Sequence, residues 1–95
     1  REVFSPRFTY HGFRYVRVKG GQDWKKEQFT ALAVSTENPV TGAFRCSDGK
    51  LNQLQHNITW SQRSNNITIP TDCPTREKAG WTGDVVVYGA TALYN

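Results

Sequence analysis

Apolar residues in the first part of the chain have the spacing of extended strands. Residues 8–18 are rich in aromatic and β-branched side chains, with apolar positions on both parities, and two glycines at 20–21 end the segment. The pair His11-Gly12 indicates a bulge or bend in this segment. Residues 29–36 form a second, nearly continuous apolar segment, as expected of a strand that is buried on both faces. Because two strands do not make a stable sheet by themselves, the pattern requires further strands.

The middle of the chain changes to helical spacing. A turn cluster of Asn, Pro and Gly at 38–42 is the best candidate for a domain boundary. Ser47 can cap a helix after it, and this helix is expected to end near Asn65. Apolar residues at helical spacing are Leu51, Leu54 and Ile58, with Trp60 as a less regular fourth. Asn57 and Gln62 could bond to the loop that follows, although a solvated helix face is the commoner fate of such residues.

The last ten residues carry two conflicting patterns. Residues 85–88 are three valines and a tyrosine, which have the propensity of a strand. Ala90 and Leu93 continue behind them at helical spacing, and Thr82 could cap a helix that starts there. The pattern alone therefore leaves strand and helix open.

Charge and composition exclude some functions. The net charge of +4 and the pI near 9.3 are modest, and the basic side chains are dispersed. Arginine alternates with aromatic residues at 13–17, a pattern found in single-stranded nucleic-acid binders. Acids cluster where a phosphate would have to sit, however, so nucleic acid is not an expected partner. No run approaches the roughly eighteen apolar residues of a spanning helix, and no signal-peptide core is visible, so no membrane contact is expected, although a leader would lie upstream.

Metal and cofactor binding are not predicted. No Cys or His pair stands at zinc-ligand spacing, His11 and His56 are each isolated, and the acids do not follow a calcium-loop pattern. The two cysteines, Cys46 and Cys73, could pair in an oxidising compartment. Cys73 could equally be a small packed thiol, and the sequence leaves the choice open.

The densest set of chemical groups lies at residues 69–84. This stretch, IPTDCPTREKAGWTGD, contains two prolines and two glycines, so neither a helix nor a strand can continue far through it. A shielded carboxylic acid can protonate a leaving oxygen, further acids and an arginine can bond sugar hydroxyls, and an indole face suits the apolar side of a pyranose. Glycosidases are built from these parts. A surface loop with solvated charges is the alternative.

Several motifs in order resemble one enzyme family. TGAFRCS at 41–47 precedes a helix with the pattern LN at 51–52 and WSQ at 60–62, and DCPTREKAGWTGD follows at 72–84. Together these motifs resemble the opening of the catalytic domain of α-L-rhamnosidases, the family 78 glycoside hydrolases. The resemblance runs from about residue 8 to residue 95 and is far more specific than a lone short motif.

The resemblance implies a fold. It predicts a fragment of a multidomain α+β enzyme, in which the tail of a β-sandwich is followed by the first helices of an (α/α)6 barrel. Residues 1–38 would be the end of the β-sandwich domain, and residues 39–95 the truncated N-terminal part of the catalytic domain. In this family the acidic loop joins two helices, so the resemblance also favours a helix over 85–94.

The resemblance assigns roles within the loop. Glu77 matches the general acid, which would protonate the glycosidic oxygen as rhamnose leaves. Asp72 and Asp84 match acids that hold the rhamnose hydroxyls. Arg76 matches a sugar-binding arginine, and Trp81 matches a ring that lines the pocket. Structural roles stay open for two of them: Trp81 as an anchor of the loop, and Asp84 as an acid favoured by a helix N-terminus.

The expected acid has a cation on each side in the sequence. Arg76 and Lys78 would keep Glu77 ionised unless its side chain is shielded, so we expect that side chain to point away from them. The resembled family works by inversion, with a water activated by a second carboxylate roughly 6.5–9.5 Å from the acid. That general base lies downstream in family members, and no residue of this chain matches it. The 95 residues alone are therefore expected to be inactive.

The predicted function is that of a fragment of an inverting α-L-rhamnosidase, a glycoside hydrolase that removes terminal non-reducing α-L-rhamnose from rhamnosides. Its expected partners are rhamnose-containing glycosides or polysaccharides and the remainder of the parent chain. A homodimer and the compartment, cytoplasmic or secreted, are left open. The alternative is a non-catalytic carbohydrate-binding module, which the acids and aromatic residues favour if the parent chain has no general base.

Overall fold

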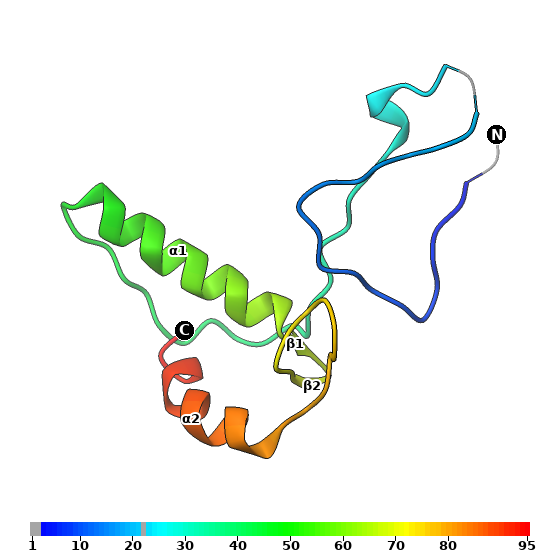
Figure 1. Ribbon diagram of the computed structural model, residues 1–95. Coiled ribbons are helices and arrows are strands. Elements are labelled where there is room, and N and C mark those ends of the chain that lie inside the picture. The colour runs from blue at the N-terminus through cyan, green and yellow to red at the C-terminus, as the bar shows by residue number, and fades with distance from the viewer. Residues whose placement is uncertain (1–2, 22) are drawn as a thin grey trace.

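The computed structural model describes residues 3–21 and 23–95, and its main elements are two helices (Figure 1). In chain order these elements are the 3-10 turn η1 (Lys26–Gln28), helix α1 (Gly49–Ser64), strands β1 (Asn66–Ile67) and β2 (Ile69–Pro70), and helix α2 (Thr82–Ala92). The N-terminal third extends away from the helices as a long open arm. The C-terminal end returns to the linker that precedes α1, where the Thr41 hydroxyl donates to the Leu93 carbonyl at 3.0 Å.

The strands expected at 8–18 and 29–36 do not form in the described part of the chain. Among the described residues two backbone bonds leave these segments for the C-terminal half, from the Gly12 N–H to the Pro74 carbonyl at 3.2 Å and from the Thr36 N–H to the Asn66 carbonyl at 2.8 Å, and η1 interrupts an otherwise irregular arm. A strand exists only when a neighbouring strand pairs with its N–H and C=O groups. No such neighbour lies beside either segment in the described residues, so the β-sandwich stays a prediction.

Helix α1 forms as the apolar spacing predicts, with a different cap. The Asp48 carboxylate, and not the Ser47 hydroxyl, accepts the Lys50 N–H at 2.8 Å and satisfies one of the free donors of the first turn. The helix ends at Ser64, one residue before the expected position. Asn65 closes it by donating from its backbone N–H and from Nδ2 to the Ser61 carbonyl, at 3.2 and 2.9 Å.

A tight hairpin follows α1. Strands β1 and β2 pair antiparallel around Thr68, which has the left-handed φ of 67°. This φ is unusual for a β-branched residue and requires support from its surroundings. The Thr36 hydroxyl supplies it by accepting the Thr68 N–H at 2.7 Å. The hairpin turns the chain into the loop that carries the candidate chemistry.

Helix α2 resolves the ambiguity at the end of the chain in favour of a helix. It begins at Thr82, so Thr82 is the first helical residue and not the cap that the sequence suggested. The N-cap is Trp81, whose side chain makes no capping bond. Asp84 lies in the first turn, where the helix dipole favours an acid. The valine run is compatible with this helix because its β-branched side chains lower helix propensity only slightly.

A polar cluster joins α1 to α2. Gln62 donates to the Ala92 carbonyl at 3.2 Å and accepts from the Tyr88 hydroxyl and from Asn95 Nδ2, each at 3.0 Å. Burial raises the pKa of the Tyr88 hydroxyl, which keeps it protonated as a donor. Gln62 therefore bonds to α2 and not to the loop. Asn57 does not reach the loop either, because its Oδ1 accepts from Gln53 on the same helix.

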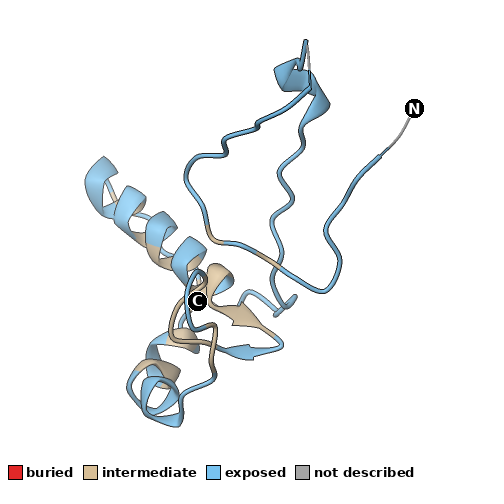
Figure 2. Cartoon of the chain, turned by 45° about the vertical axis from the view of Figure 1, so that its right-hand side comes forward, coloured by how far each residue is buried: buried red, intermediate tan, exposed pale blue. Residues whose placement is uncertain are grey.

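The described residues bury no core of their own. Within 3–21 and 23–95 no residue is buried, and most residues are exposed (Figure 2). The radius of gyration is 16.8 Å, whereas a compact domain of this size has about 13 Å. Large side chains such as Phe8 and Val86 lie open to solvent. In the described residues no helix is long and apolar enough to cross a membrane.

We expect a substitution at Gly42 to lower the local stability of the chain. A Cβ at Gly42 would overlap the Tyr94 carbonyl oxygen, and backbone cannot rotate aside as a side chain can. Gly42→Ala is therefore expected to cost about 1–3 kcal/mol of local stability. Faster hydrogen exchange of peptides from 39–48 and 89–95 in the intact protein would report this loss of local stability.

Gly49→Ala is the matched control for this substitution. Gly49 is the first residue of α1, and a Cβ there meets no atom within 4 Å. The alanine is expected to leave exchange unchanged or to slow it, because alanine is favoured over glycine in helices by about 1 kcal/mol. Equal exchange in the two variants would contradict the close approach at Gly42.

Candidate functional site

The loop between β2 and α2 closes on itself at its base. Asp72 Oδ1 accepts the Ala79 N–H at 3.0 Å, and the Asp72 N–H donates to the Ala79 carbonyl at 3.0 Å. One residue earlier, the Thr71 N–H donates to the Asn65 carbonyl at 2.7 Å, which ties the loop to the end of α1. Residues 73–78 therefore form a tip whose two ends are fixed. Gly80 lies beside this base, where a Cβ would require the end of the Ile69 side chain to move.

The Glu77 carboxylate lies at the tip between a cation and an indole. Arg76 Nη2 is 2.5 Å from Glu77 Oε1, and Trp81 Nε1 donates to Glu77 Oε2 at 3.3 Å. The expectation that Glu77 points away from both neighbouring cations is wrong for Arg76. The pair forms because adjacent side chains on an exposed tip can reach each other, and the Arg76 side chain is 82% exposed. Such an exposed pair contributes little to stability.

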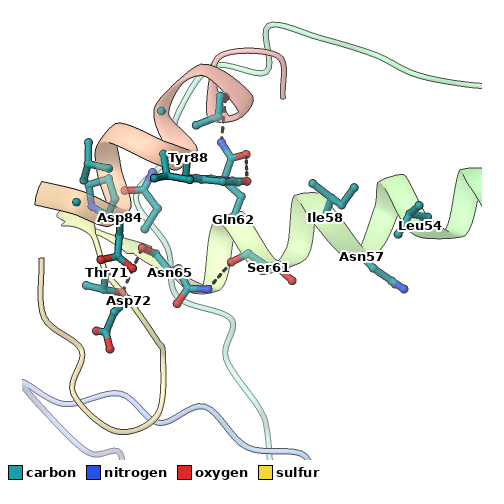
Figure 3. Close-up of a pocket in the computed structure, with 17 residues that line it drawn as sticks. Leu54, Asn57, Ile58, Ser61, Gln62, Asn65, Thr71, Asp72, Asp84 and Tyr88 are labelled. Atoms are coloured by element: carbon teal, nitrogen blue, oxygen red, sulfur yellow. Dashed lines mark hydrogen bonds between the residues drawn. The ribbon is translucent and has the colours of Figure 1, made fainter. Parts of the chain in front are cut away.

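Asp72 and Asp84 line a hollow of about 760 Å³ between α1, α2 and the hairpin (Figure 3). The wall from α1 combines apolar and amide side chains, with Ile58 and Gln62 among them, and Tyr88 contributes from α2. Glu77, Arg76 and Trp81 do not line this hollow. The five predicted site residues thus form two groups, one at the loop tip and one at the hollow, with Asp72 at the base of the loop joining them.

Trp81 is the N-cap residue of α2 and is 53% exposed. Because no described residue of this chain is buried, this exposure is compatible both with a ring that lines a pocket and with an anchor of the loop. For Asp84 the structure is compatible with both alternatives, since it lies in the first turn of α2 and also lines the hollow.

Hydrogen bonds set the ionisation of Asp72. Burial disfavours its charge, but bonds from the Ala79 and Cys73 amides and from the Cys73 side chain outweigh this effect. The pKa of Asp72 therefore lies below its ordinary value of 3.8. The carboxylate is therefore charged at neutral pH, and in this form it accepts the Ala79 N–H.

The ionised form of Asp72 is expected to stabilise the base of the loop. Because the pKa is lower in the folded state, the stabilisation is complete above 3.8 and is lost as the pH falls through the folded-state value. In the intact protein the Ala79 amide should exchange progressively faster, relative to its intrinsic rate, as the pH falls below about 4. Asp72→Asn keeps an acceptor oxygen and does not titrate. The same pH dependence in this variant would contradict the assignment.

The two cysteines do not pair. Cys46 and Cys73 are both free and half-buried. Cys73 Sγ accepts the Glu77 N–H at 3.3 Å inside the loop tip. Bonds from the backbone of Lys78, Arg76 and Glu77 lower the pKa of the Cys73 thiol, although the Asp72 side chain and burial oppose this. Cys73 therefore helps to fold the tip as a small packed thiol.

Several contacts of the loop could not be expected from the sequence. Lys78 Nζ donates to the Tyr10 carbonyl at 2.6 Å, and the Gly12 N–H donates to the Pro74 carbonyl at 3.2 Å. The glycine at 12, which the sequence suggested as a bulge, is needed for this close approach. Asn65 was expected only as a helix end, and its carbonyl also accepts from Thr71. No group of His, Cys, Asp and Glu in the described ranges could hold a metal ion.

Comparison with known proteins gives consistent results for both parts of the chain. Residues 39–95 match the family model of the bacterial α-L-rhamnosidase six-hairpin glycosidase domain, and residues 1–35 match that of the bacterial α-L-rhamnosidase concanavalin-like domain. A Streptomyces avermitilis protein named α-L-rhamnosidase is 46% identical over 98% of this chain and 9% of its own length. Proteins of the same name from Formosa agariphila and Alteromonas are 46% and 37% identical, over 97% and 96% of the chain and 10% of their own lengths.

The chain spans about a tenth of the length of these curated relatives. No solved structure matches it.

Proposed function

Since the chain belongs to the bacterial α-L-rhamnosidase family, we propose that it is part of an enzyme that hydrolyses terminal non-reducing α-L-rhamnose from rhamnosides. The observation that carries this proposal is the arrangement of the loop. Glu77 lies between an arginine and an indole N–H, and a hollow with two further acids begins at the base of the same loop. Proton donation to a leaving oxygen and recognition of hydroxyls need these groups.

Glu77 is proposed as the general acid. The glycosidic C–O bond breaks, the proton of the Glu77 carboxylic acid passes to the leaving oxygen, and a water attacks the anomeric carbon from the opposite face. The general base that takes the proton of this water is proposed to lie outside this chain. Oε2 already accepts the indole N–H of Trp81, so the proton belongs on Oε1. Arg76 must leave Oε1 for this, and its largely exposed side chain is free to turn toward the sugar.

Asp72 and Asp84 are proposed to hold the rhamnose hydroxyls. Both carboxylates line the hollow, and Asp72 also fixes the base of the loop that carries Glu77. The volume of the hollow, about 760 Å³, lies within the range of small-molecule sites, about 300–1,000 Å³. The Leu54 and Ile58 side chains in the wall from α1 suit the methyl group of a 6-deoxy sugar, and the two acids suit its hydroxyls. Rhamnose-containing glycosides or polysaccharides are thus the proposed substrate class.

The proposed domain organisation follows the sequence prediction. Residues 1–38 are the end of a β-sandwich, and residues 39–95 are the start of an (α/α)6 barrel. The family matches over 1–35 and 39–95 support this division. Two helices linked through a loop with acids at its turn are the unit from which such a barrel is built, and their open apolar faces are those that further helices would cover.

Hydrolysis of rhamnosides by the intact enzyme tests the proposal. Release of 4-nitrophenol is expected from 4-nitrophenyl α-L-rhamnoside and not from the matched β-D-glucoside. Proton NMR of early product should show β-L-rhamnose before it mutarotates, because inversion changes the α-linkage to a β-hemiacetal. α-L-Rhamnose as the first product would contradict the inverting mechanism. Absence of hydrolysis would contradict the proposal that the intact protein is a rhamnosidase.

A non-catalytic carbohydrate-binding module is the second candidate. The exposed Trp81 side chain and the ion-paired Glu77 favour it, because both can contact a sugar in a protein that has no general base and therefore does not hydrolyse it. Binding of L-rhamnose to the intact protein without any turnover of rhamnosides would support this alternative.

A further inference from the structure

The N-terminal arm contacts the loop tip at a single place. Of the described residues before Gly42, every one is exposed except Tyr10 and Gly12, and these two meet the tip. The Gly12 N–H donates to the Pro74 carbonyl at 3.2 Å, and a Cβ at Gly12 would come within 2.6 Å of Thr75 Cγ2. The backbones can approach this closely because residue 12 has no side chain. We call the contact of residues 10–12 with residues 74–78 the brace.

Lys78 carries the other half of the brace. Its Nζ donates to the Tyr10 carbonyl at 2.6 Å and lies 4.8 Å from the centre of the Tyr10 ring. A charge-assisted bond and a cation–π contact thus act on the same half-buried ammonium. Lys78 also has the left-handed φ of 54°, which is rare for a residue with a side chain and persists where its surroundings hold it.

The brace separates the two cations next to Glu77. Arg76 pairs with the Glu77 carboxylate, whereas the ammonium of Lys78 is directed to Tyr10. A second cation on the carboxylate would stabilise its ionised form and oppose proton donation. The left-handed backbone at Lys78 also sets the direction in which the chain leaves Glu77. The brace therefore acts on both the position and the charge environment of the acid.

We propose that Lys78, held by Tyr10 and Gly12, is a positioning residue for the general acid, so that the N-terminal segment takes part in catalysis by bracing the loop tip. The inference rests on the proposed role of Glu77. It assigns a function to the arm beyond its connection to the rest of the protein. Loss of the brace should impair proton donation and leave sugar binding in the hollow intact.

The test compares two rhamnosides with different needs for the acid. Methyl α-L-rhamnoside has a poor leaving group that must be protonated, whereas 4-nitrophenolate leaves without help. In the intact enzyme Lys78→Met is expected to lower kcat/KM about 10- to 100-fold on the methyl glycoside and less than about 3-fold on the 4-nitrophenyl glycoside. Lys78→Arg keeps a cation and should retain most activity on both. Lys50→Met, at an exposed position of α1, is the matched control and should match the unaltered enzyme.

A double substitution tests whether Lys78 acts through the arm. Gly12→Ala pushes the arm off Thr75 and is expected to show the same selective loss on the methyl glycoside. If both substitutions break one brace, kcat/KM of the Gly12→Ala/Lys78→Met enzyme on the methyl glycoside should equal that of the less active single variant. Additive losses would overturn the proposal, because they would mean two independent effects.

The remaining outcomes separate this inference from the proposed function. Equal losses on the two glycosides would overturn the brace, because a merely structural role lowers the amount of folded enzyme for every substrate. Full activity of Lys78→Met on the methyl glycoside would overturn it too. No hydrolysis by the unaltered enzyme would overturn the proposed function and the brace together. An unimpaired Glu77→Gln enzyme on the methyl glycoside would overturn Glu77 as the general acid and the brace with it, while hydrolysis of rhamnosides would remain.

Discussion

Glu77→Gln is expected to lower kcat/KM of the intact enzyme on methyl α-L-rhamnoside by about 10²–10⁴-fold, the usual contribution of general acid catalysis. Glutamine keeps the size of the side chain and an oxygen that can accept the Trp81 N–H, but it has no proton to give. The loss should be smaller with 4-nitrophenyl α-L-rhamnoside, because 4-nitrophenolate is a stable leaving group. Kinetics on the two substrates measure the difference directly.

The substitution should leave the fold unchanged. Glu77 is 37% exposed, and its pair with Arg76 is an exposed one that contributes about 0–1 kcal/mol at most. Hydrogen exchange of the loop at 72–79 should therefore be the same in Glu77→Gln and in the unaltered enzyme, which serves as the control for folding. Unaltered kcat/KM on the methyl glycoside would contradict the role of Glu77. A loss of the same size on both substrates would point to binding and not to proton transfer.

The sequence predicted the two helices for different reasons. α1 has one apolar face, so its spacing alone predicted it, and only its cap was assigned to the wrong neighbour, Ser47 in place of Asp48. α2 contains a valine run that suits a strand as well, and the family resemblance was needed to favour the helix. The hydrophobic pattern alone could not decide whether the strands at 8–18 and 29–36 form, because a strand depends on pairing partners that need not lie near it in the sequence.

The content of the site was predictable, and its geometry was not. The acids, the arginine and the tryptophan lie within thirteen residues, so one motif identifies them. The direction of Glu77 depends on side-chain rotation about an exposed tip, which neighbouring letters do not determine. The contact between Tyr10 and Lys78 joins residues 68 positions apart and uses both the Tyr10 carbonyl and its ring. Spacing along the chain does not show that these two residues meet, so the sequence could not signal the contact.

Trp81 joins the acid to the proposed sugar site, and its two functions can be separated. The indole N–H holds Glu77 Oε2, while the exposed ring face is free to contact the apolar side of rhamnose. Because the Trp81 side chain makes no capping bond to α2, changing it should not unwind the helix. Trp81→Phe keeps a ring and removes the N–H, and Trp81→Ala removes both.

Trp81→Ala is accordingly expected to lower kcat/KM about 10²–10⁴-fold on the methyl glycoside, from the lost ring contact and the lost bond to a charged group, about 1.5–3 kcal/mol each. Trp81→Phe should lose about 10- to 100-fold on the methyl glycoside and little on the 4-nitrophenyl glycoside, since only the placement of the acid changes. Lys50→Ala, at an exposed charged position of α1, is the control and should behave as the unaltered enzyme. If phenylalanine and alanine at position 81 give the same loss on both glycosides, the N–H and the ring do not act separately. The residue would then support the loop as one unit, and Glu77 would have to be held by Arg76 alone.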